Sequence, residues 1–326
     1  MTTEPRRWTK ASVTAVDDVA TGIRRIELEP AQTAVADPGT HVDVEVQIDG
    51  RPDIRSYSVV EADARAGTLV ITVALASPGR GGSAFMHALR PGDAIPVTLP
   101  LQNFPLLYGR SRYVLLAGGI GITALHAMSR RLAERGADYR FVYAGRSREV
   151  MPYLDDLVTE HGDRLRVHAD DEHGRLGVAE LVGGCDASTV LYMCGPKGMM
   201  DAVSAAWRDA ALSAVNLRFE TFGNSGSFAP EEFVVRIPRL GIEARVPTDT
   251  TMLDALQAAG AEMMYDCRRG ECGLCEVKIL DVTGVVDHRD VFLSQSQRDR
   301  GDRLCTCVTR VAAVGESMGS VSIDVP

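Results

Sequence analysis

The sequence lacks the features that would assign it to a secreted, membrane-spanning or nucleic-acid-binding class. Its first ten residues, MTTEPRRWTK, have no apolar stretch after the positive charges, so we do not expect a secretory signal. The longest uncharged apolar run, Tyr113 to Met128, contains three glycines and is shorter than the roughly 18 residues that a membrane-spanning helix needs. The formal net charge of −9 argues against nucleic acid, which requires a basic surface.

Internal repeats and low-complexity tracts are also missing from the 326 residues. A composition of 45% hydrophobic and 24% charged residues is typical of a soluble globular protein. A chain of this length is too long for one ordinary core, so we expect two or three domains. Unpaired thiols suit a reducing compartment, which favours the cytoplasm.

The first third of the chain, residues 1–108, shows short strands separated by turn signals. Four segments alternate apolar and polar residues or are rich in β-branched residues: Arg24–Glu29, His41–Ile48, Arg55–Val60 and Thr68–Leu75. Proline, glycine and aspartate clusters around residues 37–39, 49–50 and 91–93 separate them. The pattern predicts a small antiparallel β-barrel.

Strands alternate with helices in residues 109–224, which predicts a parallel, Rossmann-like α/β domain. The expected strands are Tyr113–Ala117, Tyr139–Ala144, Leu165–His168 and Thr189–Cys194, with helices over 123–135 and 151–160. Residues 222–230 are a linker by composition. Residues 225–326 form the third expected domain, an α+β fold with a hairpin over 232–246 and a helix that Asp249 or Thr250 caps and Gly260 ends.

Five of the seven cysteines lie in the last fifth of the chain. Cys267, Cys272 and Cys275 form C-x4-C-x2-C, and Cys305 and Cys307 follow after a long gap. Plant-type [2Fe–2S] proteins use this spacing together with one distant fourth thiolate. A zinc knuckle is the alternative, but it usually pairs two C-x2-C-like units and only one occurs here. The spacing therefore predicts an iron–sulfur protein that transfers electrons.

A glycine turn follows the first expected strand of the α/β domain. Gly119-Ile120-Gly121-Ile122-Thr123-Ala124 fits G-x-G-x-x-A, which places a pyrophosphate at a helix N-terminus. The acid expected about 20 residues later is absent, and Arg146, Ser147 and Arg148 occupy its place. They either hold a 2′-phosphate or form a solvated turn, so the residues alone leave NADH and NADPH open.

Three further segments carry weaker signals. Cys194 ends a strand at the sheet edge where ligands of α/β folds bind, although a small buried thiol is the simpler interpretation. Arg55-Ser56-Tyr57-Ser58 and Arg80-Gly81-Gly82-Ser83 lie in the barrel segment. Together they offer an aromatic ring, an arginine and backbone N–H groups for a mononucleotide, against the alternative of an ordinary strand and turn.

The motifs occur in an order that resembles one known family over essentially the whole chain. RSYS, GRGGS, NFPL, AGGIGIT, CGP, Glu220-Thr221-Phe222, CRRGECGLC, DHRD and CVTR follow one another as in the phthalate dioxygenase reductase and vanillate demethylase reductase family. The resemblance implies a flavin-binding barrel that carries FMN, an NADH-binding α/β domain and a plant-type ferredoxin domain at the C-terminus.

The resemblance also implies roles for individual residues. The FMN-binding strand contains Arg55, Tyr57 and Ser58, and its phosphate loop contains Gly81, Gly82 and Ser83. The NADH pyrophosphate turn contains Gly119, Gly121 and Thr123. Arg146 and Ser147 are added to the predicted coenzyme site by their position after the second strand, not by the resemblance. Cys194 corresponds to the thiol beside the nicotinamide and Phe222 to the aromatic residue near the flavin, and these two form the catalytic pair.

The fourth cluster ligand has two candidates. The spacing of simple plant ferredoxins favours Cys305, whereas the family's CVSR-like ending favours Cys307. Compared with the family, the segment between Cys275 and Asp287 is two residues longer, and its extra residues precede DHRD. We therefore predict Cys267, Cys272, Cys275 and Cys307 as ligands, with Cys305 as the runner-up.

These parts require a particular flow of electrons. A hydride carries two electrons and a cluster accepts one at a time, so a flavin is needed between them. We expect a monomeric reductase component that serves a terminal oxygenase, preferably of the Rieske type. A cytochrome P450 is the alternative acceptor, and a non-catalytic electron carrier is the alternative function.

Overall fold

The computed structural model describes residues 7–32, 35–76, 79–222, 226, 228–270, 272–315 and 317–325. Within these residues the chain divides into two compact units, the first ending at Glu220 and the second beginning at Thr221. We describe each unit by itself. The predicted division into three domains at 108 and 224 remains a prediction, and residue 224 lies outside the described residues, as do four of the predicted linker residues.

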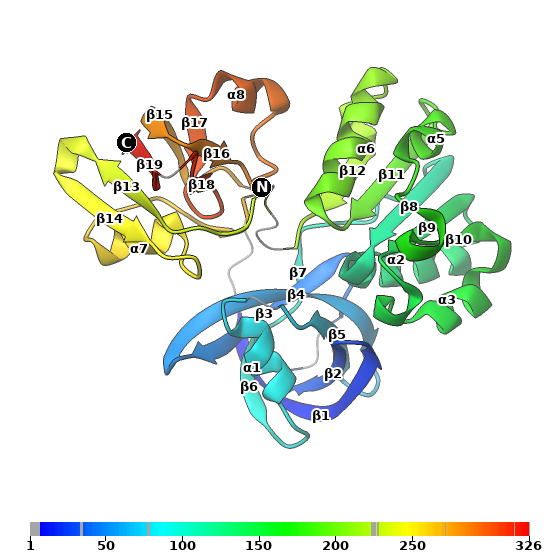
Figure 1. Cartoon of the computed structure of the whole chain (residues 1–326). Coiled ribbons are helices and arrows are strands. Elements are labelled where there is room, and N and C mark those ends of the chain that lie inside the picture. The colour runs from blue at the N-terminus through cyan, green and yellow to red at the C-terminus, as the bar shows by residue number, and fades with distance from the viewer. Residues whose placement is uncertain are drawn as a thin grey trace. The chain divides into compact units, whose positions relative to one another are not determined.

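The first unit begins with a closed antiparallel barrel (Figure 1). Its strands follow the order β4-β5-β2-β1-β6-β3, and pairing of β3 with β4 closes the ring. The bounds are β1 (Trp8–Ala20), β2 (Ile23–Pro30), β3 (Thr40–Ile48), β4 (Arg51–Asp63), β5 (Thr68–Ala74) and β6 (Ala94–Thr98), with β7 (Leu101–Gln102) beside β3 and helix α1 (Gly82–Ala88) after β5. Alternate side chains of these strands fill the barrel interior, as their period-two pattern predicts.

The same unit continues with a five-stranded parallel sheet of order β10-β9-β8-β11-β12. Its strands are β8 (Arg112–Gly118), β9 (Tyr139–Gly145), β10 (Leu165–Ala169), β11 (Thr189–Cys194) and β12 (Leu217–Glu220). The helices are α2 (Ile122–Glu134), α3 (Leu154–His161), α4 (Asp170–His173), α5 (Val178–Gly183) and α6 (Lys197–Asp209). The middle strands are buried on both faces, which explains their continuous apolar runs.

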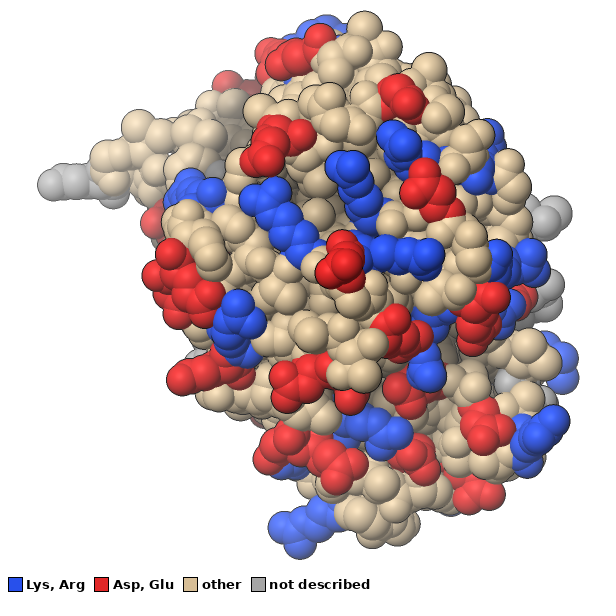
Figure 2. All heavy atoms as spheres, turned by 90° about the vertical axis from the view of Figure 1, so that its right-hand side faces the viewer, with Lys and Arg blue, Asp and Glu red and all other residues tan. Residues whose placement is uncertain are grey.

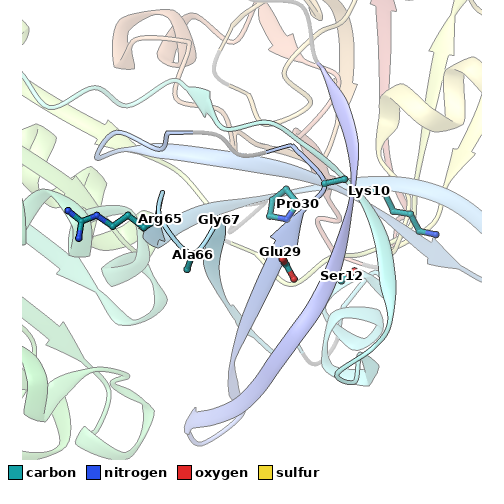
Figure 3. Close-up of a pocket in the computed structure, with 8 residues that line it drawn as sticks. Lys10, Ser12, Glu29, Pro30, Arg65, Ala66 and Gly67 are labelled. Atoms are coloured by element: carbon teal, nitrogen blue, oxygen red, sulfur yellow. The ribbon is translucent and has the colours of Figure 1, made fainter.

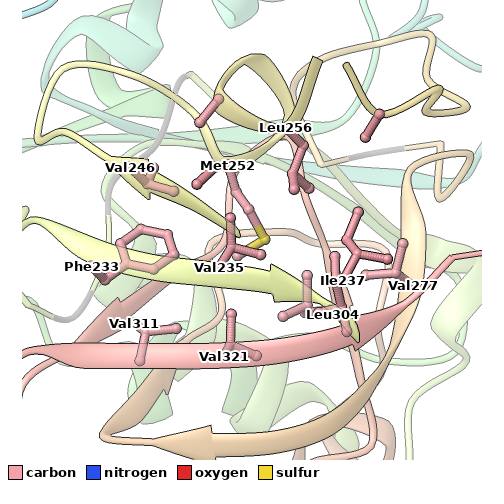
Figure 4. Close-up of a cluster of buried hydrophobic side chains, with 14 of the residues drawn as sticks. Phe233, Val235, Ile237, Val246, Met252, Leu256, Val277, Leu304, Val311 and Val321 are labelled. Atoms are coloured by element: carbon pink, nitrogen blue, oxygen red, sulfur yellow. The ribbon is translucent and has the colours of Figure 1, made fainter. Parts of the chain in front are cut away.

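The second unit is a mixed sheet of order β14-β13-β19-β15-β17 with a separate β16–β18 pair. Its elements are β13 (Phe233–Ile237), β14 (Ile242–Val246), α7 (Met252–Ala258), β15 (Glu276–Thr283), β16 (Val285–Asp287), α8 (Gln295–Arg300), β17 (Arg303–Cys305), β18 (Arg310–Ala312) and β19 (Gly319–Asp324). Figure 4 shows Met252 and Leu256 of α7 pointing onto Val235, Val277 and other apolar side chains of the sheet. These contacts pack α7 against the sheet.

Short 3-10 turns connect these elements at η1 (Gly119–Gly121), η2 (Arg148–Val150), η3 (Gly162–Arg164), η4 (Ala214–Asn216) and η5 (Pro238–Leu240). The predicted fold class is confirmed in all three parts, namely the barrel, the parallel α/β sheet and the α+β unit. Among the described residues, none of the helices combines the length and the apolar character needed to cross a bilayer.

Two element boundaries differ from the sequence prediction. Thr251, and not Asp249 or Thr250, caps α7, because its side chain accepts a hydrogen bond from the Asp254 N–H at 3.0 Å. The helix predicted from residue 151 begins at Leu154, since the preceding Tyr153 has a left-handed backbone with φ of 64°.

Candidate functional site

The glycine turn joins β8 to α2 as predicted. Gly119 has a φ of 53°, a backbone conformation that glycine adopts at little cost. Gly121 is buried, and a Cβ atom at this position would overlap the carbonyl oxygen of Cys194. The turn therefore lies directly against the end of β11, and glycine is required there by close packing.

Thr123 supports the turn internally. It is buried, and its hydroxyl donates to the Ile120 carbonyl at 3.0 Å. The Thr123 hydroxyl therefore donates to the backbone of the turn itself. The donors available to a pyrophosphate are the N–H groups at the start of α2.

A buried polar contact links the sheet edge to the barrel. Cys194 and Glu220 are register partners at the carboxyl ends of β11 and β12. The Ser58 hydroxyl of β4 donates to Oε2 of Glu220 at 3.1 Å, and both side chains are buried. The predicted residues Ser58, Cys194 and Gly121 are therefore brought together. Sequence reasoning assigned no role to Glu220, although its place at the end of a strand beside Cys194 was the available signal.

The two barrel motifs also meet. A Cβ atom on Gly82 would lie 2.7 Å from Nε of Arg55, so the arginine stem packs on the first residue of α1. Gly81 has a φ of 82°, and the Ser83 hydroxyl accepts from the Ala76 N–H at 3.1 Å. The Arg55 guanidinium lies 2.6 Å from Oδ2 of Asp53. An arginine beside a glycine cradle fits a phosphate, which would share the guanidinium with Asp53.

Tyr57 lies between these contacts on β4. It is partly buried and packs against the apolar interior of the barrel. Burial raises the pKa of Tyr57, so the phenol stays neutral at physiological pH. A neutral aromatic ring fits the predicted contact with a flavin. Phe222 is half-buried and belongs to the second unit, so its role beside the flavin stays a prediction.

The residues after β9 have different surroundings from one another. Arg146 is exposed and Ser147 is half-buried. Nε and Nη2 of Arg148 lie 2.7 and 3.3 Å from the two carboxylate oxygens of Glu172. The hydrogen bond from Arg148 lowers the pKa of Glu172 below its ordinary value, so the pair is ionised. Of the two arginines, Arg148 is thus already matched by a carboxylate.

The cluster loop occupies residues 267–275 between α7 and β15. Positive φ angles occur at Arg268, Gly270 and Gly273. Gly270 is packed against the following segment, since a Cβ atom there would lie 2.7 Å from Cα of Asp290. The Arg269 N–H donates to Sγ of Cys267 at 3.4 Å. The loop thus turns its backbone donors towards a cysteine sulfur, as sulfur ligands of a metal centre require.

The cysteine sulfurs approach one another in pairs. Sγ of Cys275 lies 3.2 Å from Sγ of Cys307. Hydrogen bonds with Cys267 and then with Cys275 raise the pKa of Cys307. Within the described residues, no group of three or more potential metal ligands is formed. The approach of Cys275 to Cys307 suits a [2Fe–2S] centre, because each of its irons takes two cysteines.

Cys305 has a different position. It is fully buried in an apolar cluster that also contains Cys275 and Cys307, and its hydrogen bond lowers the pKa of Cys275. Both Cys305 and Cys307 therefore lie close to a predicted ligand, and Cys307 as the fourth thiolate stays a prediction. The structure joins none of the seven cysteines, all within the described ranges, in a disulfide.

The DHRD and CVTR motifs form a buried frame around this loop. Arg289 lies 2.7 Å from Oδ2 of Asp287, and it donates to the Phe228 carbonyl at 3.0 Å. Arg310 donates to the carbonyl groups of Thr250 and Pro247 at 2.9 and 2.7 Å. These arginines hold neighbouring segments of the second unit in place, so both motifs have a structural explanation.

A cavity of about 490 Å³ opens on the outside of the barrel, away from all predicted residues. Its lining includes Ser12, Glu29, Pro30 and Gly67. Figure 3 shows the charged ends of Lys10 and Arg65 extending away in opposite directions. The cavity thus lacks a convergent set of polar groups, and we assign it no role.

Surface charges of the two signs are mixed. Figure 2 shows Lys and Arg side chains interspersed with Asp and Glu on the face that it presents. Ion pairs account for part of this mixing, for example Arg130 with Glu160 at 3.3 Å and Arg148 with Glu172 at 2.7 Å. Such a mixed face gives no indication of a polyanionic partner.

Comparison with known protein families matches both ends of the chain. The oxidoreductase FAD-binding domain family matches residues 11–105, and the 2Fe-2S iron-sulfur cluster binding domain family matches residues 235–312. The two matched ranges coincide with the barrel and with most of the second unit. A flavin, a pyridine nucleotide and a [2Fe–2S] cluster are therefore the cofactors of this fold combination.

Individual relatives extend the similarity over the whole chain. The vanillate O-demethylase oxidoreductase of a Pseudomonas species is 32% identical over 309 residues, which cover 91% of this chain and 95% of that protein. The solved phthalate dioxygenase reductase structure, described as modular for electron transfer from pyridine nucleotides to [2Fe–2S], has a TM-score of 0.73, 28% identity and 98% coverage of both chains. An intact type IV self-sufficient cytochrome P450 monooxygenase has a TM-score of 0.66 and 32% identity, and the similarity covers 98% of this chain but 41% of that one.

Proposed function

The chain belongs to the phthalate dioxygenase reductase and vanillate demethylase reductase family, and we propose that it transfers electrons from NADH to a terminal oxygenase of the Rieske type, with FMN and a [2Fe–2S] cluster as cofactors. The observation that carries this proposal is the meeting of Ser58, Cys194 and Glu220 beside the glycine turn. A hydride-transfer site needs a pyridine nucleotide and a flavin to meet, and these residues come from the strands that hold each of them.

The protein's own residues orient and enclose the reactants. Gly119 and Gly121 would let a pyrophosphate approach the start of α2, beside Cys194 at the sheet edge. Arg55 and the Gly81–Gly82 cradle would hold the flavin phosphate, and Tyr57 would support the flavin ring. When bound, the flavin supplies the conversion of a two-electron donor into single-electron transfers. Burial of Ser58 and Glu220 excludes water from this region.

The acceptor follows from reduction potentials. A plant-type cluster has a reduction potential of about −400 mV, whereas a Rieske centre has one of about −150 mV or higher. A difference of roughly 250 mV corresponds to about four decades in a one-electron equilibrium constant. A Rieske oxygenase is therefore a strongly favoured acceptor. The P450 similarity supports a haem acceptor as a second candidate.

Two chemical details complete the proposal. We infer FMN because the RSYS and GRGGS segments provide a phosphate site without an evident adenosine site. NADH is preferred to NADPH because Glu172 already neutralises Arg148, which leaves Arg146 as the cation for a 2′-phosphate. We also propose a monomeric, cytoplasmic protein, in keeping with cysteines that form no disulfide bond.

A steady-state assay with the purified protein tests the function. The protein should catalyse the reduction of both ferricyanide and cytochrome c by NADH, whereas a carrier without catalysis gives no turnover. The protein should also be brown, whereas a zinc protein is colourless. Flavin released by heat should run as FMN on chromatography. A higher kcat/KM with NADPH than with NADH, lost in Arg146→Ala, would contradict the coenzyme assignment.

A purified Rieske oxygenase and a P450 then decide between the two acceptors. With NADH present, the Rieske enzyme should form product when the reductase is added and should form none when it is omitted. Turnover with the P450 alone would move the assignment to the second candidate.

A further inference from the structure

The segment after β9 lacks the acidic residue that a dinucleotide-binding sheet usually places there. In the NAD-binding form of such a sheet, that acid accepts a hydrogen bond from the 2′-hydroxyl of the adenosine ribose, and in the NADP-binding form an arginine meets the 2′-phosphate. Here the β9 turn (residues 146–148) reads Arg146-Ser147-Arg148. Taken alone, these two arginines would favour a 2′-phosphate.

The β10 turn (residues 170–173) lies beside the β9 turn. Strands β8, β9 and β10 are parallel neighbours, so their carboxyl ends share the edge of the sheet that carries the glycine turn. At this edge Gly145 of β9 pairs with Ala169 of β10, and the Asp171 N–H donates to the Arg146 carbonyl at 3.1 Å. A backbone hydrogen bond therefore joins the two turns.

Glu172 brings a carboxylate from the β10 turn to the β9 turn. Its Oε1 lies 2.7 Å from Nε of Arg148 and its Oε2 lies 3.3 Å from Nη2, which is a two-point contact of carboxylate and guanidinium. The side chains of Glu172 and Arg148 are 41% and 50% exposed, so a coenzyme at this edge can reach both. The Gly174 N–H donates to the Asp170 carbonyl at 2.8 Å and closes the β10 turn that carries Glu172.

The charge of Glu172 acts differently on the two coenzymes. A carboxylate has about four lone-pair sites, so it can accept from a ribose 2′-hydroxyl while it stays paired with arginine. A 2′-phosphate carries about −1.5 to −2 charges at pH 7 and presents acceptor oxygens. It would compete with Glu172 for the donors of Arg148 and would lie beside a like charge, which is a repulsive element against NADPH.

We propose that Glu172 is the specificity-determining residue of the coenzyme site: held by Arg148, it takes the place of the acid that is absent after β9 and selects an unphosphorylated adenosine ribose. This inference rests on the proposed function, since it takes the glycine turn at residues 119–121 as the pyrophosphate site. It gives Arg148 the task of positioning a carboxylate in place of binding a 2′-phosphate.

Calorimetric titration of the full-length holoprotein with two nucleotides tests the proposal without turnover. The probes are 5′-AMP, which has a free 2′-hydroxyl, and adenosine 2′,5′-bisphosphate, which carries the 2′-phosphate. The wild type should bind 5′-AMP more tightly. Glu172→Gln removes the charge at nearly constant shape and should tighten binding of the bisphosphate roughly tenfold or more, because Arg148 becomes available to the phosphate. Its affinity for 5′-AMP should change about threefold or less, since the amide oxygen still accepts from the 2′-hydroxyl.

Two control variants separate this contact from a general change of charge. In the double variant of Glu172→Gln with Arg148→Ala, the gain in bisphosphate affinity should disappear, because the cation that the phosphate would meet is absent. Asp138 precedes β9 at the amino edge of the same sheet, and its Oδ2 lies 3.2 Å from Nε of Arg112. Asp138→Asn removes one negative charge there and should leave both affinities unchanged.

The remaining outcomes have distinct meanings. An unchanged bisphosphate affinity in Glu172→Gln, an equal gain in Asp138→Asn, or a gain that persists without Arg148 would overturn the role of Glu172 and leave the reductase function intact. Tighter binding of the bisphosphate than of 5′-AMP by the wild type would overturn the inference together with the preference for NADH. A wild-type protein that binds neither nucleotide and oxidises neither coenzyme would overturn the proposed function along with it.

Discussion

The nucleotide turn and the cluster loop both depend on glycine, but the protein fixes them by different means. The turn at residues 119–121 is held between a buried strand and a long helix, and Gly121 packs against the backbone of Cys194. The loop at residues 267–275 lies between α7 and β15, and among its described residues none belongs to a helix or strand. The Cys275 sulfur of the loop faces that of Cys307, and positive φ angles recur along the loop.

This difference shows how a site's order depends on its ligand. Regular secondary structure positions the turn before any nucleotide arrives, so its geometry belongs to the fold. Four thiolates close together repel one another unless iron neutralises them, so the loop needs its cluster for order. The first site should tolerate loss of its ligand, and the second should respond strongly to loss of any ligand cysteine.

The largest expected effect is the loss of the cluster in Cys307→Ser. We expect the EPR signal and cytochrome c reduction to disappear, while hydride transfer and ferricyanide reduction persist, because the first unit does not depend on iron. Visible absorbance and the two assays measure this together. A cluster that assembles normally in Cys307→Ser would show that the loop does not depend on this thiolate.

The second effect concerns the buried frame behind the loop. Arg289→Ala removes the buried ion-pair partner of Asp287, and breaking such a pair costs about 3–5 kcal/mol. The urea midpoint of the second unit, monitored by the loss of cluster absorbance, should therefore decrease. The exposed pair of Arg236 and Glu243 in the same unit is the control, and Arg236→Ala should cost about 1 kcal/mol or less. Similar costs for the two variants would contradict a protein-built frame.

The third effect tests the preformed turn. Gly121→Ala forces a methyl group onto the Cys194 carbonyl, and overpacking of this kind costs about 1–3 kcal/mol. We expect NADH to bind roughly 10- to 100-fold more weakly, as measured by flavin reduction at varied NADH. Gly198, at the start of α6, has open space around its Cα, so Gly198→Ala should change binding little. Equal effects of both substitutions would show that the contact with Cys194 is unimportant.

The sequence predicted the parts whose pattern is local. Strand Thr189–Cys194 was predicted with its observed bounds because a continuous apolar run between turn residues is characteristic of a buried parallel strand. Cysteine spacing and the glycine turn indicated both cofactor sites, since each needs a specific residue at a specific distance along the chain. The helix boundary at Leu154 was missed because Tyr153 adopts a left-handed conformation that its residue type does not announce.

Contacts between distant segments could not be predicted. Glu220 meets Ser58 across 162 positions, and the Arg289 contact with Phe228 spans 61. Such pairs depend on how the barrel and the sheets fold, not on local periodicity. The same limit applied to Cys305, which pairs with Glu276 in the β15–β17 register. Sequence spacing alone therefore named two candidates for the fourth ligand.

The smallest expected effect is a pH dependence confined to the first unit. His126 of α2 is buried, with its ring 4.9 Å from that of Tyr153. Burial, and then the charge of Arg130, lowers the pKa of His126 to about 4 from an ordinary value of 6.5. The unfolded chain therefore binds a proton more readily below pH 6.5, so stability falls as the pH decreases from 6.5 towards 4. For one such histidine the loss is about 1 kcal/mol by pH 5.5.

Both tryptophans, Trp8 and Trp207, lie in the first unit, so their fluorescence follows its unfolding separately from the second. Urea midpoints between pH 7.5 and 5.5 should fall more steeply in the wild type than in His126→Gln, which cannot take up the proton. His161, whose pKa burial also lowers to about 4, is present in both proteins and cancels from the comparison. Equal slopes would mean that protonation of His126 does not loosen the helix that carries the nucleotide turn. A steeper wild-type slope would show that this preformed site has an acid limit set by the packing of α2, whereas the order of the cluster loop depends on iron.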